Sequence, residues 1–131
     1  MDETIKILRE QTVLCSRLPE LFNRLIDILK TNSPDVQEPI QKISLIMREL
    51  SKSEKQSKAF LLKVHATSFV EYVSAQEKDI RRDVAENLLK KGRDFIEFNL
   101  NILARCSASD TYGAQAQTDS QRTRRMFEAN I

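Results

Sequence analysis

The sequence predicts an all-α protein, and three observations support this prediction. The chain of 131 residues contains 2 Gly and 3 Pro, too few for the many tight turns of a small β-sandwich, β-barrel or Rossmann unit. Apolar residues recur at steps of three and four along most of the chain, which is the spacing of amphipathic helices. Three such stretches have similar lengths of about 28 to 32 residues and can pack side by side. We therefore expect an antiparallel three-helix bundle of coiled-coil type over residues 1–106 and a flexible C-terminal tail over residues 107–131.

The first helix is expected over residues 3–30. Its apolar stripe comprises Ile5, Leu8, Leu14, Cys15, Leu18, Leu21, Phe22, Leu25, Ile26 and Leu29. Pro19 lies inside this stretch and removes a backbone donor, so the sequence predicts a kink near residues 15–18. Ser33 is suited to cap a following helix and Pro34 to occupy its first position, so the chain is expected to reverse here.

The second helix is expected from Val36 to Val64, and it has to end without a glycine. No Pro or Gly occurs between Pro39 and Gly92, yet one helix over that whole stretch would be about 80 Å long and could not bury its stripe. We place the break between residues 65 and 76, with a short helix of Phe69, Val70, Tyr72 and Val73 inside it.

Two capping-box patterns mark candidate helix starts within this break. Ser68 is followed three residues later by Glu71, and Ser74 by Glu77. In each pair the hydroxyl can accept from a backbone N–H of the first turn while the carboxylate reaches back. The third long helix is accordingly expected over residues 77–106.

This third helix carries two apolar faces. The expected core stripe comprises Ile80, Val84, Leu88, Phe95, Phe98 and Ile102. A second face about 130° away comprises Ala85, Leu89, Ile96, Leu100 and Leu103. Together they span roughly 200°, whereas a surface helix needs a stripe of about 100°. Two neighbouring helices could bury this excess, or it could receive an amphipathic helix of a partner. The candidate partner-binding residues are Leu89, Phe95, Ile96, Leu100 and Leu103.

Charge and hydropathy exclude several classes of partner. The 21 basic and 19 acidic residues alternate along the chain, so the sequence lacks the concentrated basic face that nucleic-acid binding requires. The longest apolar runs are far below the roughly 20 residues of a membrane span. The chain starts with acidic residues instead of a secretory leader, which indicates a cytoplasmic protein. Cys15 and Cys106 lack metal-ligand spacing and are expected to be structural thiols.

The sequence contains no recognisable catalytic, metal-binding or cofactor-binding motif. His65 is the single histidine, and a lone histidine near a helix end is typical of a capping or surface residue. Glycine-rich phosphate loops, nucleophile elbows and paired-cysteine motifs do not occur. The nearest enzymatic alternative is a helical bundle of chorismate-mutase type, which needs several inward-facing cationic side chains. On the third helix only Lys91 falls on the expected core stripe.

One segment after the third helix resembles a known family. Asn99 late in that helix, followed by Asp110-Thr111-Tyr112-Gly113-Ala114-Gln115-Ala116-Gln117 and a polar tail, is similar to FlgN-type bacterial flagellar export chaperones. This chain has Ala116 where that family often has a second glycine. The likeness extends over the whole chain, but the Tyr-Gly segment is its distinctive part.

The resemblance implies a cytosolic chaperone that works without a cofactor. Such chaperones bind the C-terminal amphipathic helices of hook-associated proteins, which form the hook–filament junction, and deliver them to the export gate. Tyr112 and Gly113 would then dock at the gate, and the third helix would hold the client. Two other binding roles remain open: a chaperone of a different secretion system, and a bundle that forms a homodimer in the absence of a client.

Overall fold

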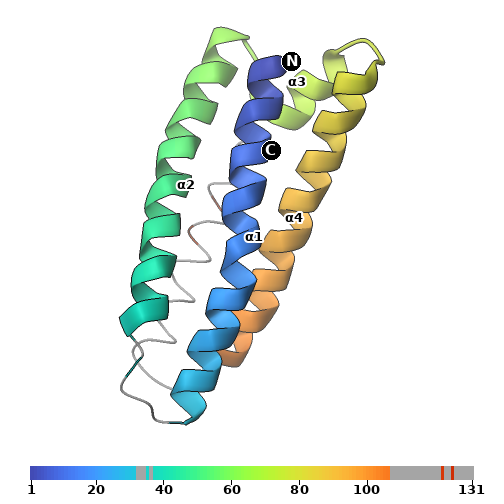
Figure 1. Ribbon diagram of the computed structural model, residues 1–131. Coiled ribbons are helices and arrows are strands. Elements are labelled where there is room, and N and C mark those ends of the chain that lie inside the picture. Colours follow the sequence, from blue (N-terminus) through green and yellow to red (C-terminus); the bar gives the residue numbers. More distant parts are fainter. Residues whose placement is uncertain (32–34, 36, 107–121, 123–124, 126–131) are drawn as a thin grey trace.

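The computed structural model describes residues 1–31, 35, 37–106, 122 and 125, and these form an all-α helical bundle (Figure 1). The helices are α1 (Asp2–Lys30), α2 (Gln37–Lys63), α3 (Phe69–Ala75) and α4 (Ile80–Cys106). The three long helices confirm the prediction of three elements of similar length, since they contain 29, 27 and 27 residues. The predicted cap at Ser33 and Pro34 and most of the predicted tail lie outside the described residues.

The long helix α1 is the central element of the bundle. It packs against both α2 and α4, whereas α2 and α4 make little contact with each other within the described residues. Figure 1 shows α2 running opposite to α1, and α4 running in the same direction as α1 on its other side. The short helix α3 packs against α4 at the end of the bundle where the chain begins, which is uppermost in this view.

Pro19 does not divide α1. The helix continues without interruption from Asp2 to Lys30 although Pro19 lies inside it. Upstream of Pro19, two hydroxyl side chains of α1 bond to carbonyls of the same helix. The Thr12 hydroxyl donates to the Leu8 oxygen at 2.7 Å, and the Ser16 hydroxyl donates to the Val13 oxygen at 2.7 Å.

The end of α2 confirms that the chain turns there without glycine. His65 has a φ of 58°, in the left-handed region that usually favours glycine after a helix. The Ala66 N–H donates to the Leu61 oxygen at 3.0 Å, and the His65 N–H to the Leu62 oxygen at 3.3 Å. These two bonds form a Schellman motif, which satisfies carbonyls of the last helical turn. His65 therefore serves as a turn residue.

The predicted short helix and its cap are confirmed at α3. The Glu71 N–H donates to the Ser68 hydroxyl oxygen at 3.1 Å, which makes Ser68 the N-cap. The Glu71 carboxylate accepts from the Thr67 N–H at 2.9 Å and also from the Thr67 hydroxyl. These two bonds, the hydroxyl bond first, hold the pKa of Glu71 below its usual value.

The predicted start of α4 at residue 77 is wrong. The helix begins at Ile80, and the Arg82 N–H donates to the Asp79 Oδ1 atom at 2.7 Å. Asp79 thus takes the capping role that the sequence pattern had suggested for Ser74. Ser74 instead lies in the last turn of α3. An aspartate at this position caps a helix as well as a serine does, and its charge also favours the positive end of the helix dipole.

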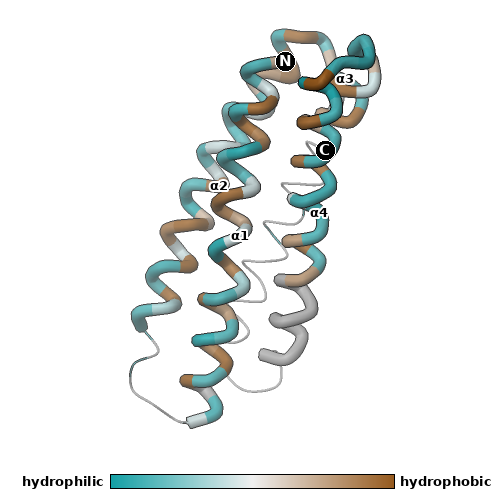
Figure 2. Tube along the Cα trace, turned by 45° about the vertical axis from the view of Figure 1, so that its right-hand side comes forward, coloured by the Kyte–Doolittle hydropathy of each residue, from teal (hydrophilic) through white to brown (hydrophobic). Residues whose placement is uncertain are grey.

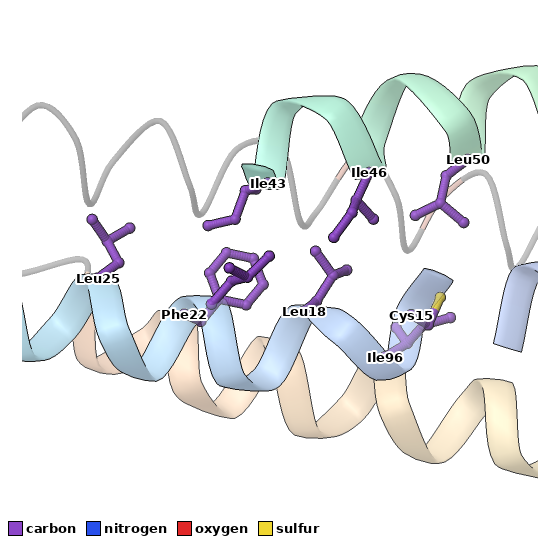
Figure 3. Packing of buried hydrophobic residues seen from close by; sticks show 9 residues of the cluster. Cys15, Leu18, Phe22, Leu25, Ile43, Ile46, Leu50 and Ile96 are labelled. Carbon is purple, nitrogen blue, oxygen red and sulfur yellow. The ribbon is translucent and has the colours of Figure 1, made fainter. Parts of the chain in front are cut away.

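Two apolar clusters fill the bundle, one at each end. The upper cluster contains residues of all four helices: Ile7, Leu8, Phe60, Leu61, Phe69, Val73, Ala85 and Leu89. The lower cluster joins α1, α2 and Ile96 of α4 and contains Cys15, Leu18, Leu21, Phe22, Leu25, Ile43, Ile46, Leu50 and Ile96. Figure 3 shows the side chains of Leu18 and Phe22 pointing toward the α2 residues Ile43 and Ile46.

A buried polar layer lies between the two clusters. The Gln11 amide donates to the Ser57 hydroxyl at 2.8 Å, and this hydroxyl donates to the backbone oxygen of Ser53 at 3.0 Å. All three residues are buried. Because a buried amide is costly when it is unpaired, this pairing favours one alignment of α1 against α2.

Candidate helix-binding surface

The buried face of α4 carries Leu89 and Ile96, two of the residues predicted to bind a partner. Ala85 and Gly92 are buried, and the exposed fractions of Leu89 and Ile96 are 4% and 7%. These residues lie at steps of three and four, so they form one continuous stripe along the helix. This stripe faces the core, since Leu89 belongs to the upper cluster and Ile96 to the lower one.

The face predicted to be the core stripe is instead partly open to solvent. Ile80 is 82% exposed and Phe98 is 49% exposed, which contradicts the prediction that both are core residues. Between them, Val84, Leu88 and Phe95 are half-buried. We call these five side chains the α4 stripe. The side chain of Ile102 is outside the described set.

Two half-buried members of the α4 stripe, Leu88 and Phe95, lie at the edge of the core. Leu88 packs against the upper cluster and Phe95 against the lower one. Lys91 lies on the same side of the helix between them and is exposed. Figure 2 shows apolar and polar residues alternating along the described part of α4. The α4 stripe is therefore a fixed, discontinuous apolar ridge on a helix that the core anchors.

Among the residues predicted to bind a partner, Phe95 lies on a different face of α4 from Leu89 and Ile96. Phe95 belongs to the α4 stripe, while the other two are committed to the interior of the bundle. Leu100 and Leu103 lie in the last turns of α4, where only the backbone is described. Tyr112 and Gly113 lie outside the described residues.

Two features of the sequence could have indicated the correct orientation of α4. Ala85 and Gly92 are small and lie seven residues apart on the face that packs, and small side chains at a contact let two helices approach closely. Lys91 lies in the middle of the expected core stripe, where a charge would need a partner if it were buried. The structure resolves both points, because the small residues face the core and Lys91 faces solvent.

Cys15 is the only titratable side chain that is fully buried among the described residues. Burial raises the pKa of the Cys15 thiol to about 12, so this cysteine stays protonated and unreactive at neutral pH. The described Lys and Arg side chains are exposed or half-buried, and the described part of the chain shows no cationic interior of the kind that a chorismate-mutase site requires.

Across the described residues, no three or more His, Cys, Asp or Glu side chains gather closely enough to hold a metal ion. Nor does any described helix combine the length and the apolar character needed to cross a membrane.

Comparison of the chain with protein-family models, with curated proteins and with solved structures found no match. The functional hypothesis rests instead on a structural feature, the partly exposed α4 stripe.

Proposed function

We propose that this chain is a non-enzymatic binding protein that takes an amphipathic helix of a client along the α4 stripe. The observation that carries the proposal is the exposure of Phe98 and Ile80 beside half-buried Leu88 and Phe95. Aromatic side chains bury a large area and contribute strongly to the energy of interfaces when a partner removes them from water.

The spacing of the α4 stripe suits a helical client. Val84, Leu88, Phe95 and Phe98 follow steps of four, seven and three residues, which keep them on one side of α4. Such a ridge can pack into the apolar seam of a partner helix, as in helix-in-groove and coiled-coil recognition. Exposed Lys91 at the centre of the ridge would favour a client with an acidic residue at the facing position.

We further propose that the clients are flagellar hook-associated proteins and that the protein is a cytoplasmic export chaperone. This part of the proposal rests on the resemblance of Asn99 and the segment 110–117 to FlgN-type chaperones. Client helices of that kind aggregate unless their apolar side is covered, and the α4 stripe supplies a cover. Tyr112 and Gly113 would then dock at the export gate.

A homodimer is the second candidate, because the same α4 stripe could cover that of a second copy. The two candidates differ in their dependence on concentration. A homodimer would dissociate on dilution and would compete with client binding, whereas a monomeric client-binding protein would show neither effect.

The proposal is tested by titrating labelled peptides of hook-associated C-terminal helices into the purified protein. Phe98→Asp should weaken binding by about 30-fold, since an aromatic anchor is typically worth 2 kcal/mol or more. Leu45→Asp is the matched control, because Leu45 is a similarly exposed apolar residue on α2. Equal loss in both variants, or unchanged affinity in Phe98→Asp, would refute the proposed surface.

A further inference from the structure

A second candidate binding site lies away from the α4 stripe, in a groove between α1 and α2. It has a volume of about 430 Å³, and its lining is mostly apolar. Val13, which is 49% exposed, and half-buried Leu14 supply apolar surface from α1. The groove is thus a concave surface with an aliphatic wall, a form suited to a side of another helix.

Two arginines of α1 give this groove a cationic excess. Arg9 and Arg17 line it four residues before and four residues after Val13, and neither forms an ion pair with another described residue. Glu10 is the acidic residue that α1 contributes. On the α2 side, Glu49 is already paired with Lys52 at 3.2 Å. An occupant with carboxylates would compensate the two free guanidinium groups.

The groove also adjoins an unsatisfied hydroxyl. Ser53 lines the groove from α2 and is 4% exposed, and its Oγ atom has no hydrogen-bond partner among the described residues. A buried hydroxyl without a partner costs free energy. A carboxylate or carbonyl oxygen brought into the groove could accept from it after a small side-chain adjustment.

We propose that the α1–α2 groove binds an acidic amphipathic helix of a partner protein. Arg9 and Arg17 are eight residues apart on α1, so they are separated by about 12 Å along the helix axis. A partner helix lying alongside can match them with two acidic residues seven or eight positions apart, and can place an aliphatic residue midway against Val13. This site is separate from the α4 stripe and goes beyond the proposed client-binding function.

The charge pattern favours a discrete helix over a membrane or a nucleic acid. The groove contains Glu10 and Glu49 among its cations, so its charge is mixed and it lacks the concentrated basic face that a phosphate backbone or an anionic surface requires. A helix with separate acidic residues can meet each arginine and avoid both glutamates. Specificity would come from the spacing of the acidic residues, because the Arg9–Val13–Arg17 row is fixed on one side of α1.

The experiment uses the full chain and a fluorescein-labelled helical peptide with two glutamates eight residues apart and a leucine midway between them. Binding is followed by fluorescence anisotropy. The double variant Arg9→Glu/Arg17→Glu should weaken binding by about tenfold, because each reversal replaces an attraction with a repulsion of the size usual for exposed ion pairs. Val13→Asp should also weaken it, and circular dichroism verifies that each variant is folded.

The double variant Arg48→Glu/Lys55→Glu is the matched control, since it makes the same change of net charge at exposed α2 residues that do not line the groove. Retained affinity in this control supports the site. Three results would each overturn the site. These are equal loss of affinity in both double variants, no binding of the acidic peptide by the unmodified chain, and equal binding of a peptide with both glutamates changed to glutamine. Equal displacement of the peptide by anionic phospholipid vesicles or by a duplex oligonucleotide would overturn the assignment to a helix. Phe98→Asp should leave this affinity unchanged, so failure of one site is distinguishable from failure of the other.

Discussion

Truncation of Ile96 and of Phe98 provides a direct test of how α4 is oriented. Ile96 is 7% exposed and packs in the lower cluster, to which Cys15 of α1 also belongs (Figure 3). Ile96→Ala removes buried carbon atoms from the lower cluster and leaves a cavity there. It should therefore lower the free energy of unfolding by about 2–4 kcal/mol. Phe98 already has about half of its surface in water. Phe98→Ala should therefore cost about 1 kcal/mol, roughly half of the transfer free energy of a fully buried phenylalanine.

The measurement is urea-induced unfolding followed by far-UV circular dichroism, with the two variants and the unmodified chain at the same concentration. Equal slopes of the unfolding free energy against urea would show that each substitution acts on stability alone. The orientation of α4 would be wrong if Phe98→Ala cost as much as Ile96→Ala, or if Ile96→Ala cost less than about 0.5 kcal/mol, the range of ordinary surface substitutions. The opposite ranking is expected for client binding, since Phe98 is accessible to a partner and Ile96 is not.

Three further predictions concern the turns that join the helices. His65→Gly should raise the free energy of unfolding by about 0.5–1 kcal/mol, because glycine adopts the positive φ of this position without the side-chain penalty. Thermal unfolding measures this change in stability. A destabilised variant would contradict the assigned turn. Ser68→Ala should lower the free energy of unfolding by about 1 kcal/mol through loss of the N-cap, whereas Ser74→Ala should leave it nearly unchanged. Comparable losses in the two variants would mean that the second capping box also forms. Since the pKa of Glu71 is lowered in the folded chain, its contribution is present above the unfolded pKa and is lost as pH falls through the lower folded pKa. The stability difference between the unmodified chain and Glu71→Gln should accordingly shrink across that acid range, and a difference independent of pH would contradict it.

The lengths and number of the helices were predictable because the signals for them are local. Apolar residues spaced three or four apart predict a helix, and this spacing involves only residues in adjacent turns of that helix. The Ser68 cap is equally local, since its bond to the Glu71 N–H spans three residues. The start of α4 was misplaced because two serine–glutamate pairs were weighed as helix starts and Asp79 was not. The sequence supplies several residues able to cap a helix, and the surrounding fold determines which of them is used.

The orientation of α4 could not be predicted from its hydropathy, because apolar residues cover both of its candidate faces. Either face could be buried without leaving the other fully polar. The structure buries the one with Ala85 and Gly92, where small residues let α4 approach α1 closely. Hydropathy does not distinguish the two faces, whereas residue size at Ala85 and Gly92 and charge at Lys91 do.

The arrangement of the bundle explains why α4 retains apolar surface after folding. In a closed three-helix bundle each helix packs against two long neighbours, which would bury an arc of about 200°. Among the described residues, however, α4 packs along α1 and against α3, a helix of only seven residues at the upper end, and makes little contact with α2. One long neighbour buries one stripe, so the adjacent stripe with Leu88, Phe95 and Phe98 stays partly in water. A longer α3, or α2 packed directly on α4, would cover this surface, and the proposed client site would then disappear with the exposure that defines it.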